Sequence, residues 1–166
     1  MTSLVNGQRV LFDEDQRDMI EWWVVNDGVM GGLSEGSMSI HDNNALFKGA
    51  VSTANNGGFA MVRGGLKKLN IDSYSHFVLH IKGDGKNYQF RTKSEASQRH
   101  SYVQSFKTNG EWQEIVIPFD VLEARFRGRN VNLPNFEGET LAEVSFLIGN
   151  KADETFELQI KSIRLK

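Results

Sequence analysis

The fold is decided by residues 77–93, which read FVLHIKGDGKNYQFRTK. Apolar side chains occupy every second position of residues 77–81, and Tyr88 and Phe90 repeat this spacing after the segment 83–86. Successive side chains of a β-strand point to opposite faces, so a period of two predicts a strand with one face in a core and the other in water. Residues 77–93 therefore predict two half-buried strands joined by a turn.

Segments of the same character run through the rest of the chain. Phe156, Leu158 and Ile160 alternate with polar residues, and further segments of strand length lie at residues 8–12, 37–41, 45–52, 58–63, 101–107, 112–117 and 144–149. Together they predict about ten short strands separated by turn residues, a pattern typical of sandwiches and jelly rolls. The sequence therefore predicts an all-β fold, a β-sandwich or jelly roll, as a single domain over residues 1–166.

Turn residues separate the expected strands. The segments 55–58, 83–86 and 109–110 combine Asn, Asp and Gly, which adopt positive φ at little cost, and we expect hairpins there. After Ile160 the apolar positions change parity, which predicts a β-bulge near residues 161–162.

Helix is expected in at most one or two short places. Residues 13–21 fit a short helix capped by Asp13, and an irregular polar loop fits them equally well. Residues 119–124, which follow Pro118, fit a single helical turn.

The composition excludes several classes of protein. A net charge of −2 and a pI near 6.1 argue against a general nucleic-acid binder, which carries a basic excess. The chain has no cysteine, which excludes disulfides and thiolate metal sites. No apolar segment approaches the roughly 18 residues that a membrane-spanning helix needs. The first residues lack the features of a secretory signal, so we expect a cytoplasmic protein.

Neither a metal nor a catalytic site is expected. His76 and His80 are the histidines nearest in sequence, but on a strand they stand about 13 Å apart, too far to share one metal ion. The carboxylates are scattered, and no Gly-X-Ser-X-Gly nucleophile motif is present. Oxygen ligands for Ca²⁺ are offered by Asp42, Asn43 and Asn44 and by Asn55 and Asn56, although turn formation explains these residues more simply. We therefore expect no cofactor and a non-enzymatic role.

A first candidate binding site is the segment 22–32, which reads WWVVNDGVMGG. Its Asn, Asp and Gly residues tolerate turn and left-handed conformations. One interpretation is a partner-binding loop shaped by Trp22, Asp27, Met30, Gly31 and Gly32. The alternative is a structural turn in which the Asp27 carboxylate accepts backbone hydrogen bonds.

A second candidate is the segment 125–129, which reads RFRGR and places three guanidinium groups in five residues. Arg127 and Arg129 would hold a phosphate or carboxylate group of a partner by bidentate contacts. The alternative is that these arginines pair within the chain, for which the candidate carboxylates are Glu114, Asp120 and Glu137.

A third candidate is the set of outward-facing residues on the two strands of residues 77–93. If these strands were neighbours in one sheet, His80 and Arg91 would lie on one polar, basic face. Arg91 would then anchor a protein partner. The alternative ligand is a carbohydrate bound by His80 and Arg91, with Tyr102 or Trp112 as the aromatic surface on which a sugar ring stacks. An ordinary solvated face is the remaining interpretation.

Motifs distributed along nearly the whole chain occur in a characteristic order. They are residues 22–32, 47–49, 51–52, 56–60, 62–63 and 83–86, then Tyr88, Arg91 and Trp112, and finally residues 117–119 and 126–129. In this order and spacing the chain resembles the complex I intermediate-associated protein family, whose fold is similar to galactose-binding-like jelly rolls.

The resemblance implies a function without catalysis. Eukaryotic members of the family are assembly chaperones that hold partly built membrane-arm subunits of complex I. By this resemblance the chain looks like a compact bacterial member, because it lacks an import sequence. Its expected partners are protein subunits of a multisubunit, membrane-associated complex.

Overall fold

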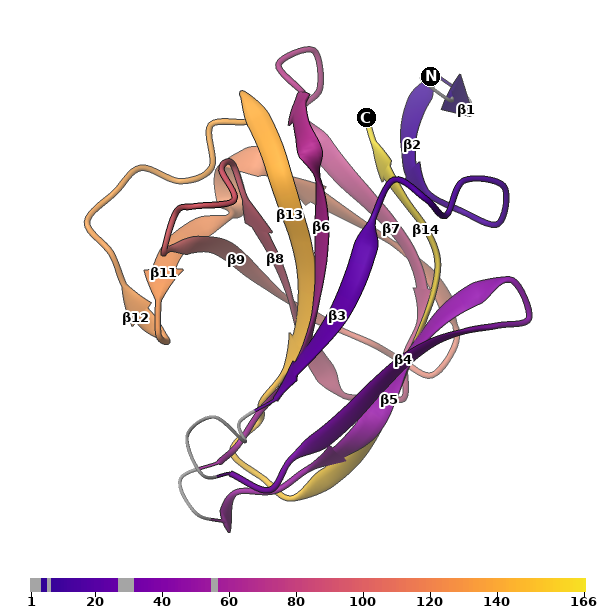
Figure 1. Ribbon diagram of the computed structural model, residues 1–166, viewed down its shortest axis with the longest axis vertical. Helices are drawn as coiled ribbons and strands as arrows, with labels where there is room; N and C mark the ends of the chain where they lie inside the picture. The colour runs from indigo at the N-terminus through magenta and orange to yellow at the C-terminus, as the bar shows by residue number, and fades with distance from the viewer. Residues whose placement is uncertain (1–3, 6, 27–31, 55–56) are drawn as a thin grey trace.

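The computed structural model describes residues 4–5, 7–26, 32–54 and 57–166, which form two antiparallel β-sheets packed face to face (Figure 1). The strands of the first sheet are β1 (Leu4–Val5), β2 (Gln8–Phe12), β4 (Glu35–His41), β5 (Asn44–Val51), β7 (His76–Lys82), β10 (Trp112–Pro118) and β14 (Glu154–Leu165). Those of the second sheet are β3 (Glu21–Asn26), β6 (Ala60–Asn70), β8 (Asn87–Lys93), β9 (Ser101–Lys107), β11 (Glu123–Phe126), β12 (Arg129–Asn130) and β13 (Thr140–Ile148). The predicted all-β jelly-roll sandwich is confirmed.

Strand β14 organises the first sheet. On one side it pairs with β5 over residues 154–160 and with β2 over residues 163–165, and on the other side it pairs with β7. Strands β4 and β10 lie at edges of this sheet, as does β1, which pairs only with β2. In the second sheet the order of strands is β12-β11-β9-β8-β13-β6-β3.

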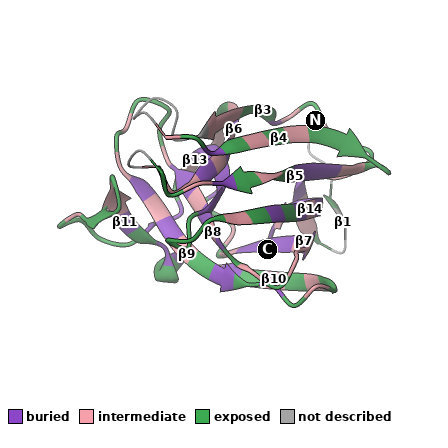
Figure 2. Cartoon of the chain, turned by 90° about the horizontal axis from the view of Figure 1, so that it is seen from below, coloured by how far each residue is buried: buried purple, intermediate pink, exposed green. Residues whose placement is uncertain are grey.

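The core lies between the sheets and is rich in phenylalanine. The rings of Phe77 on β7 and Phe90 on β8 have centroids 4.8 Å apart, so side chains of the two sheets meet directly. Phe47 and Phe156 pack at 4.7 Å in the same core. Burying one such side chain stabilises the fold by about 1.5–3 kcal/mol. Buried residues alternate with more exposed ones along most of β14, and exposed residues alternate with less exposed ones along β10, as a period of two requires (Figure 2).

The strand predictions are confirmed, because every expected segment overlaps a strand and residues 8–12 and 101–107 match β2 and β9 in full. The bulge is also confirmed: the register of β14 against β7 shifts between Ile160 and Ser162.

The hairpin predictions are wrong. Residues 83–86 connect β7 of the first sheet to β8 of the second, and residues 109–110 connect β9 back to β10. Residues 55–58 join β5 to β6, again across the sheets, and Asn55 and Asn56 themselves lie outside the described residues. Gly85 and Gly110 do have positive φ, but a chain that crosses between sheets needs that conformation as much as a hairpin does.

A tight hairpin joins β4 and β5 instead. Asp42 and Asn43 have φ values of 49° and 66°, and His41 pairs with Asn44. These residues, considered above as calcium ligands, therefore have the left-handed conformations of a two-residue β-turn.

The helix expected over residues 13–21 is absent from the structure. The Asp13 carboxylate does accept hydrogen bonds from the backbone N–H groups of Asp15 and Gln16, at 2.9 and 2.8 Å. These bonds close a turn, and β3 begins at Glu21, so the polar-loop alternative is correct. The second expected helical turn exists but is shorter, a 3-10 helix over Phe119–Val121.

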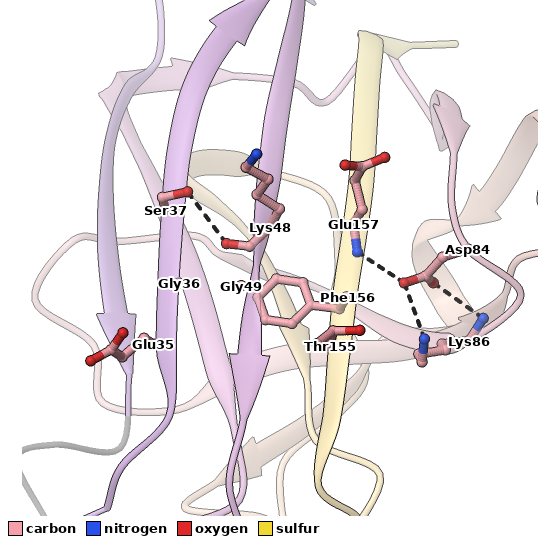
Figure 3. Close-up of a pocket in the computed structure, with 10 residues that line it drawn as sticks. All are labelled: Glu35, Gly36, Ser37, Lys48, Gly49, Asp84, Lys86, Thr155, Phe156 and Glu157. Atoms are coloured by element: carbon pink, nitrogen blue, oxygen red, sulfur yellow. Dashed lines mark hydrogen bonds and ion pairs between the residues drawn. The ribbon is translucent and has the colours of Figure 1, made fainter.

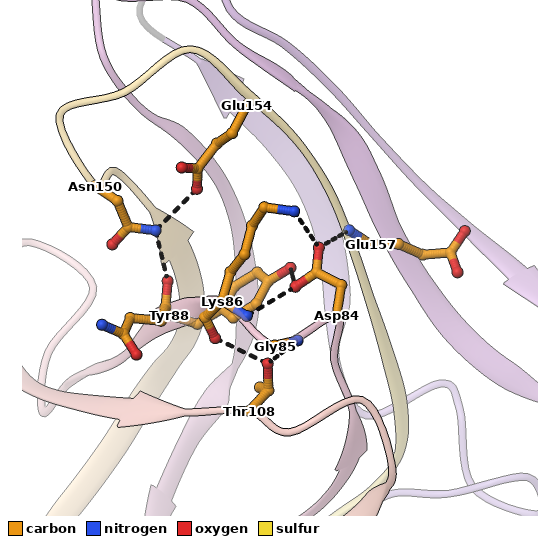
Figure 4. Close-up of polar contacts among 9 residues, drawn as sticks. Asp84, Gly85, Lys86, Tyr88, Thr108, Asn150, Glu154 and Glu157 are labelled. Atoms are coloured by element: carbon orange, nitrogen blue, oxygen red, sulfur yellow. Dashed lines mark hydrogen bonds and ion pairs between the residues drawn. The ribbon is translucent and has the colours of Figure 1, made fainter.

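The turn between β7 and β8 is fixed by Asp84 (Figure 4). Its carboxylate accepts hydrogen bonds from the Tyr88 hydroxyl at 3.0 Å and from the backbone N–H of Glu157 on β14 at 2.9 Å. The Thr108 hydroxyl accepts a bond from the Gly85 N–H and donates one to the Lys86 carbonyl. Asp84 thus ties a connection between the sheets to the central strand of the first sheet, which gives the 83–86 motif a structural role.

The environment of Tyr88 predicts a loss of stability at alkaline pH. Burial and then the charge of Asp84 raise the pKa of the Tyr88 phenol above its ordinary value of 10.0. Above that pH the unfolded chain loses this proton while the folded protein keeps it, so stability falls as pH rises, by about 1.4 kcal/mol per pH unit for one proton. Urea melts between about pH 9 and 11 should show a shallower fall for Tyr88→Phe. An identical slope in both proteins would contradict this assignment.

Candidate functional site

The outer face of the second sheet carries a continuous row of side chains, one from each of six neighbouring strands. The registers of β3, β6, β13, β8, β9 and β11 align, in that order, Trp23, Arg63, Ser145, Arg91, Val103 and Glu123. Directly paired residues of antiparallel strands point to the same face. Phe90, the sequence neighbour of Arg91, and Phe146, the sequence neighbour of Ser145, point into the core. Because adjacent residues of a strand point to opposite faces, the row faces outward. We call these six residues the lateral row.

An ion pair lies beside the lateral row. Arg63 donates to Oε1 of Glu143 from Nη2 at 2.7 Å and from Nε at 3.0 Å. The Ser145 hydroxyl donates to Oε2 of the same carboxylate at 3.0 Å. The Glu143 side chain is only 8% exposed. Both of its oxygens are therefore engaged in a nearly water-free position.

Positive charge exceeds negative charge on this face. Burial lowers the pKa of Arg91 and of Lys93, while the nearby carboxylate of Glu143 opposes that shift. The Lys93 ammonium donates to the Gln98 carbonyl at 3.1 Å, and Arg125 lies 3.6 Å from the Glu123 carboxylate. Among the residues that the structure describes, none accepts a hydrogen bond from the Arg91 guanidinium.

Trp23 stands at one end of the lateral row, beside a groove. Its side chain is 43% exposed, and the Arg63 guanidinium lies 5.3 Å from the ring centroid. A Cβ at Gly65 would come within 3.1 Å of the ring, so the indole lies over this glycine. The groove measures about 500 Å³ and is lined by Trp23, Arg63, Gly65 and Glu143. The rest of its lining is charged at Asp18, Glu21 and Lys67 and apolar at Met19, Leu66, Ala96 and Ala142. It offers an aromatic edge and an ion pair to a ligand.

The described residues of the expected partner-binding loop do not lie together on the lateral row. Trp22 packs on the core side, with its ring centroid 6.1 Å from that of Phe12, so its neighbour Trp23 is the tryptophan on the outer face. Gly32 precedes β4, and Asp27, Met30 and Gly31 lie outside the described residues.

The predicted arginine anchors lie on the same sheet but apart. Arg91 is central in the lateral row, whereas Arg127 and Arg129 belong to the β11–β12 hairpin at the edge. Arg127 has φ of 52°, and its guanidinium lies 5.3 Å from the ring of Phe126. In the described part of the chain, no ion pair joins either edge arginine to Glu114, Asp120 or Glu137.

The residues proposed for sugar binding lie on different faces of the protein. His80 is on β7 and Arg91 is on β8, and these strands belong to different sheets. The expectation that His80 and Arg91 share one face is therefore wrong. His80 does meet Trp112 on the first sheet, with ring centroids 5.4 Å apart, and burial followed by the charge of Lys161 lowers the pKa of His80. Tyr102 lies on the core side of the second sheet, with its ring centroid 5.1 Å from that of Phe136.

A second groove, of about 620 Å³, crosses the first sheet over β4, β5 and β14 (Figure 3). Gly36 and Gly49 lie along it, and charged side chains of both signs surround it, among them Glu35, Lys48 and Glu157. Its charges nearly balance, so it lacks the positive excess of the lateral row.

The residues that the structure describes contain neither a metal-binding cluster nor a membrane-spanning helix. No group of three or more His, Cys, Asp or Glu side chains there is arranged to hold a metal ion. No helix in the same residues is long and apolar enough to cross a membrane.

Comparison with solved structures identifies carbohydrate-binding modules of the same fold. The family 11 module of a cellulosomal cellulase from Clostridium thermocellum aligns with a TM-score of 0.68 at 16% identity, over 98% of this chain and 95% of that one. The same kind of module in complex with a β-1,3-1,4-mixed-linked tetrasaccharide gives 0.67 at 15% identity, over 95% and 94%. A family 29 module gives 0.60 at 9% identity, over 94% and 85%. Identities this low establish the shared fold alone.

Comparison at the level of sequence identifies the family. No curated protein matches the chain. The model of the complex I intermediate-associated protein 30 family matches residues 10–160, which is most of the sequence and includes all six strands that carry the lateral row. The chain therefore belongs to the complex I intermediate-associated protein 30 (CIA30) family.

Proposed function

We propose that this protein is a single-domain, non-enzymatic protein-binding module that acts as an assembly factor for a multisubunit respiratory complex. Membership in the CIA30 family supports the assembly role. The observation that carries the proposal is the lateral row, where an exposed tryptophan and two arginines share one outer face. Tryptophan and arginine contribute a disproportionate share of binding energy at protein interfaces.

The proposed binding surface combines a groove with a rigid support. Trp23 is held over Gly65 by the guanidinium of Arg63, and Arg63 is in turn held by Glu143. Side chains held in place before binding lose little conformational entropy when a partner docks. This preorganisation supports the lateral row as the surface that contacts the client.

The experiment is to follow the tagged protein on native gels of the native cell and to identify the subunits cross-linked to it. We expect it to migrate with partly assembled complex I. Trp23→Ala should weaken client capture about tenfold, as loss of an interface anchor does. Trp112→Ala is the matched control, because this tryptophan has a similar exposure, 39% against 43%, but lies on the opposite sheet. Absence of any complex I subunit from the wild-type sample would defeat the assembly role.

A second candidate function is carbohydrate binding, and the pairing of His80 with Trp112 on the outer face of the first sheet favours it. An exposed aromatic ring beside polar groups is suited to stacking on a sugar ring. The Lys161 ammonium, 6.0 Å from the centroid of the Trp112 ring, competes for that ring. Calorimetric titration with mixed-linkage β-glucan tests this function: binding that Trp112→Ala abolishes would establish it and displace the assembly role as the primary one.

A further inference from the structure

We propose that the client segment bound by the lateral row is acidic, and that Arg91 receives one of its carboxylates. This inference rests on the proposed function, because it assigns the chemistry of the partner at the same surface.

The Arg91 guanidinium has hydrogen-bonding capacity that the described residues do not use. Its directly paired neighbours on the lateral row are Ser145 and Val103, which carry no charge. The nearest carboxylate, that of Glu143, is already engaged by Arg63 and Ser145. A guanidinium has five N–H donors in a planar fork that matches a carboxylate. Among the described residues, the half-buried Arg91 guanidinium therefore has no hydrogen-bond acceptor and is suited to bind an anion.

The net charge of the outer face also favours an acidic partner. The outer-face positions of these strands carry a local excess of two positive charges (5 − 3): the cations are Arg63, Arg91, Lys93, Lys107 and Arg125, and the carboxylates are Glu21, Glu123 and Glu143. The chain as a whole carries a net charge of −2. A concentrated positive patch on a protein of opposite net charge attracts anions to that patch specifically.

The surroundings of Arg91 suit a peptide better than a sugar. Tyr102, the tyrosine nearest to Arg91 along the sheet, faces the core, and the ring of Trp23 is engaged by the Arg63 guanidinium. An aromatic platform for stacking sugars is therefore poorly developed around Arg91. The Arg91 guanidinium lies between the Ser145 hydroxyl and the apolar Val103. These neighbours suit a carboxylate on a short aliphatic side chain, such as that of Asp or Glu.

The spacing of the strands sets the pattern of the segment. Trp23 and Arg91 are separated by three strand intervals, from β3 through β6 and β13 to β8. At about 4.8 Å per interval this is about 14 Å, the length of roughly four extended residues. We therefore infer a client segment in which an apolar residue, seated in the groove beside Trp23, stands about four positions from an acidic residue bound by Arg91.

The test measures binding of fluorescein-labelled hexaglutamate to the full chain by anisotropy. We expect binding that Arg91→Gln weakens about tenfold and that Arg91→Lys, which keeps the charge but not the fork, weakens less. Lys161→Gln is the control, because it removes one positive charge from the opposite sheet. Thermal melts establish whether each variant is folded. If Arg91→Gln does not fold, the binding measured for Arg91→Lys still decides the test.

Three results would overturn the inference: no hexaglutamate binding by the wild type, equal losses for Arg91→Gln and Lys161→Gln, or binding of polygalacturonate without binding of hexaglutamate. The last result would assign the site to acidic polysaccharides. Client capture that persists unchanged in Arg91→Gln would defeat the acidic-segment inference while leaving the assembly role intact. Arg91-dependent hexaglutamate binding without any client capture would defeat the assembly role alone.

Discussion

Glu143→Ala is expected to lower the free energy of unfolding by about 3–5 kcal/mol, the cost of removing one partner from a buried ion pair. The carboxylate lies among the cations Arg63, Arg91 and Lys93 and is itself nearly inaccessible to water. Its removal leaves the Arg63 guanidinium without its acceptor and removes the negative charge nearest to the other two. Urea melts at neutral pH measure the loss.

Glu123→Ala is the matched control. Glu123 faces the same side of the same sheet, but its side chain is 49% exposed and lies 3.6 Å from an Arg125 nitrogen. An exposed pair of this kind contributes about 0–1 kcal/mol. Equal losses for the two variants would show that solvent screens Glu143 and that the outer face is not organised around it.

Gly49→Ala is expected to destabilise the protein by about 3 kcal/mol, at the upper end of the usual cost of overpacking. A Cβ at this position would lie 2.0 Å from the carbonyl oxygen of Glu35 and 2.7 Å from the Cα of Gly36. Both atoms belong to the backbone of β4, which cannot move away without breaking its pairing with β5. Circular dichroism melts and hydrogen exchange along β4 would register the change.

Gly36→Ala provides the comparison, because Gly36 pairs directly with Gly49 across the two strands. Its added Cβ would meet only side chains, the nearest being the ring of Phe47 at 3.3 Å, and a small shift of that ring relieves the contact. We expect a cost below about 1 kcal/mol. A larger loss for Gly36→Ala than for Gly49→Ala would contradict the close backbone approach.

The positions of the strands were predictable from the sequence, but their assignment to sheets was not. The alternation in residues 77–93 correctly identified β7 and β8 and the faces on which His80 and Arg91 lie. It could not reveal that the chain crosses from one sheet to the other between them. A turn that contains Gly and Asp provides positive φ both in a hairpin within one sheet and in a connection between two sheets. Only the packing of distant strands decides which of these forms.

The candidate site was predictable only in part, because the sequence shows the face on which a residue lies but not which strands pair. Arg91 was identified because its own strand shows which face it occupies. Arg63 and Glu143 were missed because they are 80 residues apart, and only the pairing of β6 with β13 brings them together. A signal did exist: Glu143 is the charged residue in the otherwise uncharged segment 140–148, and a charge in a buried strand requires a partner.

The central position of β14 has a consequence for how the protein is made. Its pairing partners β2, β5 and β7 all precede it in the chain by many residues, so the first sheet stays divided until residues 154–165 have been synthesised. Until then the newly made β5 and β7 expose unpaired edges and apolar faces, which are sites of aggregation. Folding dominated by such distant pairings takes milliseconds to seconds. On the ribosome, this domain therefore depends on its last strand, and a general chaperone would protect the exposed edges until that strand has been made.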